Sequence, residues 1–410
     1  MEAWNNYFGN TTPTELLETY GSPLYVYNEE ILRRHCNELK TFCPYENFVI
    51  DYSMKANFNP SILKIAREEG LEVDAMSVGE MKIAEMAGYT PDEIFFVCNN
   101  VGAEEMQYAI DRGIRISVDS LSQLELFGKL SPNSKIAIRV NPGVGAGHHE
   151  KVVTAGKATK FGITMDSLDE IYAICEKYNL TIAGINQHIG SLFLEGDKYL
   201  SSIESLFTFC KNFKDLDFID FGGGFGIPYQ KGVARLDLKD LGQKMNDAFE
   251  KFCAEYGRKI QFRVEPGRYV AAESSCILGT VHAVKNNYEK TYVGTDVGFN
   301  VLVRPIMYDS FHEIELYKDG KLVEETNGNV ATIVGNICES GDILGKDRPF
   351  PVAEEGDIVC VRDAGAYGHV MSSNYNGRLR PAEVMITTNG EAKIIRKRDT
   401  YEQLMENYVM

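Results

Sequence analysis

Residues 48–77 read FVIDYSMKANFNPSILKIAREEGLEVDAMS and carry the pattern on which the fold prediction depends. An apolar run at Phe48 to Met54 is followed by apolar residues at helical spacing, Ser61 to Glu69, and by a second apolar run, Glu72 to Ser77. Short apolar runs separated by a helical period are typical of parallel strands joined by crossover helices. We therefore interpret this stretch as one strand–helix–strand unit.

The same alternation continues to about residue 268. Six further strands are expected, at Ile94 to Cys98, Arg115 to Asp119, Lys135 to Val140, Ile182 to His188, Phe218 to Phe221 and Gln261 to Glu265. Helical spacing recurs between many of them, as in Gly79 to Ala87, Ala103 to Asp111 and Leu238 to Glu255. Eight parallel strands with crossovers can close without leaving a sheet edge, so we predict a TIM-type (β/α)8 barrel at residues 30–268. An open doubly wound sheet is the alternative that this pattern leaves.

After Gly267 the helical period disappears. Runs of β-branched residues separated by Gly, Asn and Asp turns predict an antiparallel β-barrel or sandwich, with strands at Ile277 to Val284, Thr291 to Thr295, Val330 to Val334 and Asp357 to Val361. The alternating segment Pro23 to Tyr27 is expected to complete this sheet. Residues 1–29 and 269–410 are thus assigned to one β domain with a short C-terminal helix, and the basic stretch Lys393 to Arg398 of the C-terminal tail is interpreted as a solvated face.

Composition excludes several classes of protein. The 59 acidic residues exceed the 42 Lys and Arg, and the formal net charge of −17 disfavours nucleic acid as a partner. The first twenty residues lack a basic start, and no run of about 18 apolar residues occurs, so neither export nor a membrane association is expected. Nine cysteines without a CxxC pair predict reduced and mostly buried thiols, no metal site and a cytoplasmic protein, with Cys338 as the functional exception.

In such a barrel, the chemistry lies on the loops that follow the carboxyl ends of the strands. Polar residues or glycines stand within, at the end of or just after most of the predicted strands, namely Lys55, Asp74, His188, Ser191, Gly222 to Gly224, Glu265 and Arg268. The segment from Asn141 to Met165 holds five glycines and little periodicity. A connection of that length is expected to be a lid, a binding loop or a mobile segment.

Three of these features together suggest one cofactor. A desolvated lysine such as Lys55 can form a Schiff base with an aldehyde. The glycines of IDFGGGFG do not fit a dinucleotide fingerprint, but their backbone N–H groups can hold a single phosphate. The carboxylate of Glu265 can keep a pyridine nitrogen protonated, which lets the ring accept a carbanion left by departing CO2. We therefore expect pyridoxal 5′-phosphate.

With these residues, the chain resembles the fold-type III pyridoxal-phosphate-dependent decarboxylases. The resemblance runs along nearly the whole chain through the ordered motifs YSMKAN, VDAMSVGE, RVNPGVG, KFGI, HIGS, GGGFG, EPGRYVA, GFN, RPIMY, ICESGD, DAGAYG and MSSNYNGRLRPAEV. It implies a barrel followed by a β domain. It also implies a homodimer whose active sites are shared across the interface.

Carried over residue by residue, the resemblance implies that Lys55 joins the cofactor aldehyde, His188 stacks on the ring and Glu265 binds the ring nitrogen. It implies further cofactor contacts, chiefly to the phosphate, from Ser191, Gly222, Gly223, Gly224, Gly267, Arg268 and Tyr367. It also implies that Cys338 and Glu339 enter the site of the partner subunit. There Cys338 would donate a proton to the carbanion and Glu339 would contact the substrate.

The substrate is predicted from Arg268, Arg304 and Tyr308, with Tyr367 as a further contact. Two guanidinium groups suit a distal carboxylate, whereas they would repel the distal ammonium of a substrate such as ornithine. With Glu339 pairing the distal amine, this set matches meso-2,6-diaminopimelate, which decarboxylation would convert to L-lysine and CO2 in lysine biosynthesis.

Two readings remain as alternatives. One is a decarboxylase of D-ornithine, D-lysine or carboxynorspermidine, and the other is a non-catalytic regulator that binds pyridoxal phosphate. Val301 in GFNVL and Leu192 after HIGS depart from the family pattern. Since neither belongs to the predicted cofactor or clamp residues, these departures are expected to affect specificity only.

Overall fold

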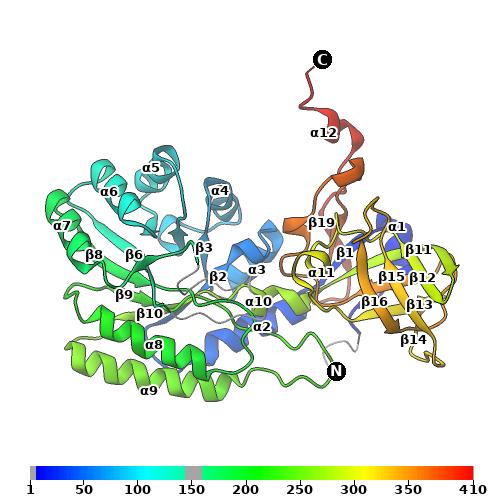
Figure 1. The fold of residues 1–410 in the computed structure, drawn as a ribbon, viewed down its shortest axis with the longest axis horizontal. Helices are drawn as coiled ribbons and strands as arrows, with labels where there is room; N and C mark the ends of the chain where they lie inside the picture. Colours follow the sequence, from blue (N-terminus) through cyan, green and yellow to red (C-terminus); the bar gives the residue numbers. More distant parts are fainter. Residues whose placement is uncertain (1–5, 144–158, 410) are drawn as a thin grey trace. The chain divides into compact units, whose positions relative to one another are not determined.

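The computed structural model describes residues 6–143 and 159–409, which form two compact units. One unit comprises His35–Ile227 and Ala234–Tyr269 and contains a sheet of parallel strands. The other comprises Met1–Arg34, Pro228–Val233 and Val270–Met410 and consists mainly of strands. Figure 1 follows the chain through both units, and each is described by itself below.

The first unit is a closed barrel. Around it run eight parallel strands, β2 (Phe48–Ser53), β3 (Glu72–Ala75), β4 (Ile94–Val97), β5 (Arg115–Val118), β6 (Lys135–Asn141), β8 (Thr181–Asn186), β9 (Phe218–Asp220) and β10 (Gln261–Val264). The sheet closes because β10 pairs with β2 and β5 pairs with β6. All eight predicted strands are present, so the TIM-type barrel is confirmed and the open doubly wound sheet is excluded.

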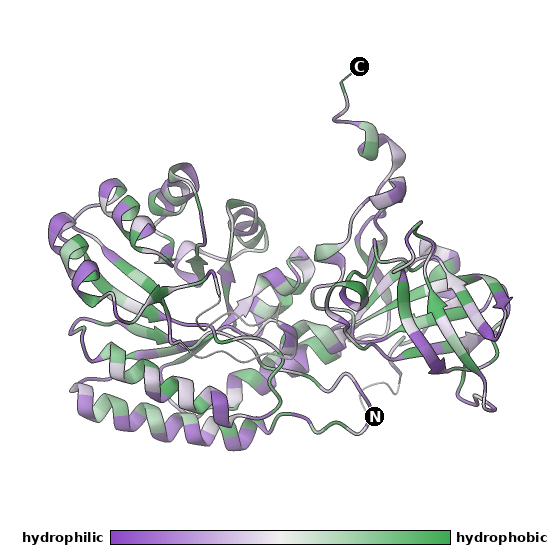
Figure 2. Ribbon diagram, in the orientation of Figure 1, coloured by the Kyte–Doolittle hydropathy of each residue, from purple (hydrophilic) through white to green (hydrophobic). Residues whose placement is uncertain are grey.

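Helices alternate with these strands along the chain (Figure 1). They are α2 (Glu29–Thr41), α3 (Pro60–Glu68), α4 (Val78–Met86), α5 (Ala103–Arg112), α6 (Leu121–Leu130), α7 (Leu168–Tyr178), α8 (Asp197–Cys210) and α9 (Leu238–Tyr256). Figure 2 shows apolar and polar residues alternating along them, as amphipathic helices require. The start of α3 is set by Asn59, whose side chain accepts a hydrogen bond from the Ser61 amide, and by Pro60 in the first turn. This cap ends the short loop that carries Lys55.

The predicted long loop after β6 is described only in part. Residues 144–158 of it lie outside the described residues. Beyond them, the short strand β7 (Ile163–Thr164) pairs in parallel with the end of β6, through Val140 and Ile163. The role of this loop as a lid or binding loop stays a prediction.

A largely buried ionic cluster joins the barrel strands β10, β2 and β3. Arg263 of β10 donates from Nε to Asp51 Oδ2 of β2 at 2.8 Å and also contacts the Glu72 carboxylate of β3. Arg263 and Asp51 have no exposed side-chain surface. The two carboxylates keep the pKa of Arg263 above its ordinary value despite burial, which lowers it. Three strands are therefore joined by one guanidinium group.

Arg263→Met is expected to destabilise the protein by about 3–5 kcal/mol, because it leaves buried carboxylates without their cation. Urea unfolding monitored by circular dichroism measures this loss. The control is Arg112→Met, which removes a half-exposed arginine paired with Glu85 on the helix surface and should cost at most about 1 kcal/mol. Equal losses in the two variants would contradict the role given to the buried cluster.

The second unit is built on a ten-stranded sheet. Its strands are β1 (Leu24–Asn28), β11 (Ser275–Asn287), β12 (Lys290–Thr295), β13 (Ile314–Lys318), β14 (Lys321–Val323), β15 (Val330–Val334), β16 (Ile343–Pro349), β17 (Ile358–Val361), β18 (Ala382–Ile386) and β19 (Ala392–Arg396). As predicted, the N-terminal segment completes this sheet, since β1 lies between β11 and β18. The prediction of a purely antiparallel sheet is wrong for two pairs, because β1–β18 and β12–β15 run parallel.

The basic stretch Lys393 to Arg398 exposes Lys393 and Lys397, as expected of a solvated face, but part of it forms a strand. Lys393 and Ile394 belong to β19 and pair with Met385 and Val384 of β18. Arg398 donates from Nη2 to the Pro23 carbonyl oxygen at 2.6 Å. The short strand β19 (Ala392–Arg396) was not predicted, because its apolar and polar residues alternate only weakly and it contains basic residues. The expected C-terminal helix is present as α12 (Tyr401–Met405).

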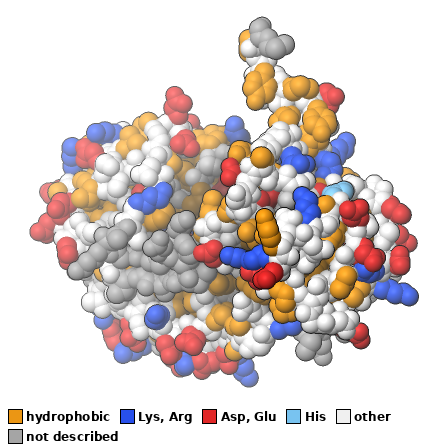
Figure 3. Space-filling model, turned by 45° about the vertical axis from the view of Figure 1, so that its right-hand side comes forward, with side chains coloured by type: hydrophobic (Ala, Val, Ile, Leu, Met, Phe, Trp, Pro, Cys, Tyr) orange, Lys and Arg blue, Asp and Glu red, His pale blue; other side chains and the backbone are white. Residues whose placement is uncertain are grey.

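The remaining predictions from composition concern cysteines, charge and membrane spans. Seven of the nine cysteines are buried, Cys175 is half-buried and Cys338 is exposed, so the expected burial pattern is confirmed. On the face drawn in Figure 3, acidic and basic side chains are interspersed. Within residues 6–143 and 159–409, no helix combines the length and the apolar character needed to cross a membrane.

Candidate active site

Lys55 lies in a single turn, Met54–Ala56, at the carboxyl end of β2. Its Nζ is 3.9 Å from Asp74 Oδ2, and about a third (35%) of its side chain is exposed, whereas the Asp74 side chain is fully buried. Burial raises the pKa of Asp74, and the charge of Lys55 opposes that shift. Ser53 Oγ donates to the same Asp74 oxygen at 3.2 Å. The lysine amine is thus oriented by one carboxylate and remains accessible.

The glycine turn after β9, residues 222–224, packs too closely against its neighbours for any side chain. A Cβ on Gly223 would lie 2.0 Å from the Glu265 carbonyl oxygen, and one on Gly224 would lie 2.6 Å from the Gly190 carbonyl oxygen. Gly222 also has a positive φ of +70°. Glycine is therefore required here, and the turn joins the ends of three strands in one place.

His188 stands two residues beyond β8 and faces this turn. Its Nδ1 accepts a hydrogen bond from the Gly223 amide at 3.0 Å. Burial, followed by the charges of Lys55 and Arg139, lowers the pKa of His188 well below its ordinary value. The imidazole is therefore neutral near pH 7 and carries its proton on Nε2. A neutral ring held in a fixed orientation is suited to stack on a flat cofactor.

Glu265 follows β10 directly and is buried. Burial raises the pKa of its carboxyl well above the ordinary value, and the neighbouring charge of Asp220 raises it further. Asn186 Nδ2 donates to Glu265 Oε1 and to Asp220 Oδ2, both at 3.2 Å. The predicted ring-nitrogen ligand is thus part of a larger buried polar group.

Apart from Tyr367, which belongs to the β unit, the residues predicted to bind phosphate lie at the same end of the barrel. Arg268 donates from Nη2 to Ser191 Oγ at 2.9 Å. A Cβ on Gly267 would lie 2.9 Å from the Cβ of Ala56, next to Lys55. Together with the contact between the glycine turn and Gly190, these approaches place every barrel residue of the predicted site around one space. Leu192, which departs from the family pattern, has a positive φ of +66° in the same loop.

Three residues at this barrel end were not predicted as site residues. Asn186 and Asp220 are the last residues of β8 and β9, and Arg139 lies on β6. The charge of Arg139 acts on both His188 and Glu265. All three are buried and stand in apolar runs. A polar residue two positions before the HIGS motif and another two positions before the GGGFG motif were the available signals for the first two.

The other predicted residues belong to the β unit. Arg304 and Tyr308 lie on α11 (Arg304–Tyr308). The Arg304 side chain is buried, with Nη1 2.8 Å from His312 Nε2 and the guanidinium 4.8 Å from the centre of the Tyr229 ring. A guanidinium that is held on two sides is rigid. Its role as a substrate clamp stays a prediction.

Cys338 and Glu339 are exposed in the loop before β16. The Cys338 amide donates to Asn376 Oδ1 at 2.8 Å, and Tyr375 donates from its hydroxyl to Glu339 Oε1 at 3.1 Å. Tyr367 is half-buried with a positive φ of +57°. The loop that carries Cys338 is thus fixed to the chain around Tyr375.

Val301, the second departure from the family pattern, is a core residue of the β unit. Its side chain is buried, and its carbonyl oxygen accepts a hydrogen bond from the Tyr25 hydroxyl at 2.7 Å. The apolar side chain is therefore explained by packing.

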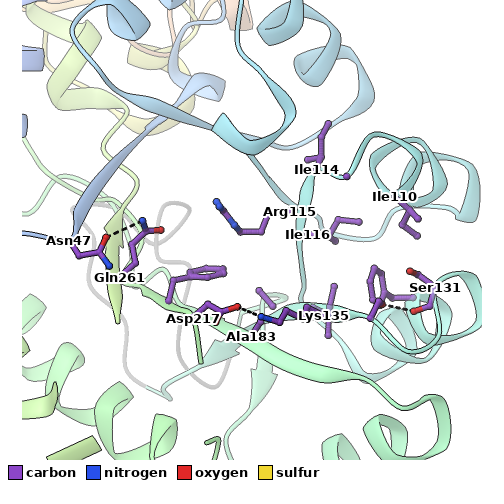
Figure 4. Close-up of a pocket in the computed structure, with 16 residues that line it drawn as sticks. Asn47, Ile110, Ile114, Arg115, Ile116, Ser131, Lys135, Ala183, Asp217 and Gln261 are labelled. Carbon is purple, nitrogen blue, oxygen red and sulfur yellow. Dashed lines mark hydrogen bonds and ion pairs between the residues drawn. The ribbon is translucent and has the colours of Figure 1, made fainter. Parts of the chain in front are cut away.

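A cavity of about 560 Å³ lies at the opposite, amino-terminal end of the barrel strands (Figure 4). Arg115 lines it together with the ion pair between Lys135 Nζ and Asp217 Oδ2, which are 2.7 Å apart. None of the predicted site residues lines this cavity. It is therefore distinct from the cluster at the carboxyl ends of the strands.

The cluster at the carboxyl ends fits pyridoxal phosphate. It offers an accessible amine for the aldehyde, a neutral imidazole for the ring face and a buried carboxyl for the ring nitrogen. A Cβ at any of the three turn glycines would overlap a main-chain oxygen of a neighbouring segment, so only residues without side chains can form this turn, and the amides of Gly222 and Gly223 donate to Asp220 and His188. All of these groups come from the barrel unit.

Comparisons with known proteins agree with this chemistry. Residues 29–272 match the family described as pyridoxal-dependent decarboxylase, pyridoxal binding domain. The chain is 39% identical over 406 residues to a diaminopimelate decarboxylase of Methanothermobacter thermautotrophicus, covering 97% of this chain and 94% of that one. It is 34% identical to a diaminopimelate decarboxylase of Escherichia coli K12, covering 94% and 93%. A crystal structure of diaminopimelate decarboxylase from Helicobacter pylori complexed with L-lysine superimposes with a TM-score of 0.87 at 29% identity, covering 96% and 98%.

Proposed function

Because this chain belongs to the pyridoxal-dependent decarboxylase family, we propose that it decarboxylates meso-2,6-diaminopimelate at the D-configured centre and releases L-lysine and CO2 for lysine biosynthesis. The observation that carries this proposal is the meeting of Lys55, His188, Glu265 and the glycine turn at one end of the barrel. The diaminopimelate decarboxylases that match nearly the whole chain support the choice of substrate.

Pyridoxal phosphate, when bound, supplies an electron sink for the electron pair that remains after CO2 leaves. Lys55 would hold its aldehyde, and Glu265 would face its ring nitrogen. The phosphate and the rest of the cofactor would be held by Ser191, Gly222, Gly223, Gly224, Gly267, Arg268 and Tyr367. The neutral ring of His188 would cover one face of the cofactor without adding a positive charge that would repel the ring nitrogen.

Lys55 and Cys338 would move the protons of the reaction. The nitrogen of Lys55 lies 3.9 Å from Asp74 Oδ2, and in its ammonium form it would donate a proton to the carbon that has lost CO2. The thiol of Cys338 is exposed and can donate a proton to the carbon that has lost CO2. Because the loop of Cys338 is tied to Tyr375 and Asn376, the thiol would be presented on a fixed support.

Selection of the distal end of the substrate would fall to Arg268, Arg304, Tyr308, Tyr367 and Glu339. A guanidinium binds a carboxylate through two parallel hydrogen bonds, so the distal carboxylate would be recognised by geometry as well as charge. Glu339 would pair with the distal ammonium. A substrate that lacks the distal carboxylate would leave the guanidinium groups without an anion.

We further propose that two copies form a homodimer, in which Cys338 and Glu339 of each copy complete the site of the other. The exposure of both side chains supports this arrangement, because a partner subunit could reach them. Nine free cysteines support a reducing location such as the cytoplasm.

We expect kcat/KM for meso-diaminopimelate to exceed that for L-ornithine, L-lysine, D-ornithine and D-lysine by at least about 100-fold, because those substrates leave buried polar partners unpaired. Release of CO2 from each compound, with pyridoxal phosphate present, measures this ratio. The LL isomer of diaminopimelate tests the stereochemical choice. Faster reaction of a compound without the second carboxylate would contradict the clamp, and bound cofactor without any turnover would favour the non-catalytic regulator.

A further inference from the structure

Glu265 belongs to a buried polar cluster in which the side-chain amide of Asn186 bridges two carboxyl groups, those of Asp220 and Glu265. Asn186 and Asp220 are direct neighbours across the parallel strands β8 and β9. Glu265 follows β10 by one residue, and its amide donates to the Gly222 carbonyl oxygen at 3.0 Å. The two hydrogens of Asn186 Nδ2 therefore serve Asp220 and Glu265, one each. Asp220 Oδ1 accepts a further hydrogen bond from the Gly222 amide at 2.8 Å.

Burial of these polar groups opposes folding, so packing alone does not explain the arrangement. Asn186 and Asp220 have no exposed surface, and Glu265 is 3% exposed. Asn186 Oδ1 is buried without a hydrogen-bond partner among residues 6–143 and 159–409. A buried acceptor left unpaired and two buried acidic groups in contact each oppose folding. Such unfavourable groups concentrate at functional sites.

We propose that Asn186 and Asp220 are positioning residues that fix Glu265 and place a second negative charge behind it, so that the ring nitrogen of the cofactor keeps its proton. The inference rests on the cofactor role proposed above. Asn186 would orient the Glu265 carboxyl. Asp220 would supply the second negative charge behind it.

The charge states of the pair support this division. Burial raises the pKa of Asp220 to about 6, and burial together with the charge of Asp220 raises the pKa of Glu265 well above its ordinary value. The pKa of Glu265 is therefore raised further than that of Asp220, and a proton shared by the pair resides preferentially on Glu265. A ring nitrogen facing Glu265 would lie beside two acidic groups, which would favour its protonated form.

The other charged or titratable groups that act on this pair do not replace Asp220. They comprise cations on three strands or their loops, a buried carboxyl pair and two aromatic side chains, namely Lys55, Arg139, Arg263, Asp51, Asp74, His188 and Tyr199. Lys55 and Arg139 lower the pKa of Glu265, Arg263 is neutralised by Asp51, and His188 is uncharged. Among these groups, Asp220 has the largest electrostatic effect on Glu265.

The test uses the holoenzyme loaded with pyridoxal phosphate labelled with 15N at the ring nitrogen. In Asp220→Asn, the pH at which the 15N signal changes from the protonated to the neutral form should fall by about one to two units relative to wild type. The value of kcat should fall about tenfold or more, whereas KM should change less than about threefold. Asn186→Leu should weaken cofactor binding and shift the same titration.

The matched control is Asp217→Asn. Asp217 directly precedes β9 and pairs with Lys135 at the opposite end of the barrel (Figure 4), so its loss should leave the 15N titration unchanged. An identical titration in wild type and Asp220→Asn, with cofactor bound and turnover intact, would overturn this inference and leave the proposed function standing. Absence of any bound signal in the wild type would overturn both.

A second measurement needs no cofactor. A carboxyl whose pKa is raised by folding stabilises the folded state below its ordinary pKa, and that contribution is lost as the pH rises through the raised value. The ordinary pKa of Asp220 is 3.8 and its raised value is about 6. The unfolding midpoint of the cofactor-free wild type should therefore fall more between pH 5 and pH 8 than that of Asp220→Asn. Equal falls in the two proteins would count against the buried pair.

Discussion

Lys55→Ala is expected to lower kcat for decarboxylation by at least about 10³-fold, the largest loss from any single substitution in the barrel. Alanine removes the amine that would hold the cofactor aldehyde and would exchange protons with the substrate. It also leaves the Asp74 carboxylate, which is fully buried, without the cation 3.9 Å away. Two functions and one ion pair are therefore lost together.

The measurement combines steady-state kinetics with the visible absorbance of the protein after incubation with pyridoxal phosphate. Lys55→Ala should lose the yellow band of the lysine-linked cofactor, whereas phosphate contacts from the glycine turn should still allow weak binding. Lys64→Ala is the control, because Lys64 is an exposed residue of α3. A Lys55→Ala protein that keeps more than a tenth of wild-type activity would contradict the assignment of this amine.

The barrel could be predicted because its signal is local and repeated. Each parallel strand is buried on both faces and reads as a short apolar run, and each crossover helix carries apolar residues at helical spacing. Phe48 to Met54 and Glu72 to Ser77 thus anticipated β2 and β3 within two residues. The β unit was less predictable. Strand direction depends on which distant segment pairs with which, so the parallel pairing of β12 with β15 leaves no mark in either sequence.

The site was predictable where a residue type is chemically unusual for its place. A lysine after a buried strand and three glycines in a row stand out, so Lys55 and the turn at 222–224 were identified at once. Asn186 and Asp220 did not stand out, because a single polar residue at the end of an apolar run is compatible with an ordinary strand end. Only the contacts of Asn186 with two carboxyls show that these residues belong with Glu265.

Cys338→Ala is expected to lower kcat by about 10²-fold or more, which is the usual contribution of a positioned proton donor. The more decisive experiment mixes this variant with Lys55→Ala. If Cys338 acts in the site of the partner, a mixed dimer contains one site with both residues intact and one site with neither. Random pairing of equal amounts makes half of the dimers mixed, so about a quarter of all sites and about a quarter of wild-type activity should return.

The control for this recovery is a mixture of Lys55→Ala with Glu265→Ala. Both residues lie at the carboxyl end of the same barrel, so each site of a mixed dimer would lack one of them and no activity should return. Recovery in the first mixture and none in the second would separate a shared site from simple stabilisation by a partner. Activity that stays at the average of the two parents in both mixtures would place Cys338 outside the partner's site, because the exposed loop at Tyr375 would then serve only its own chain.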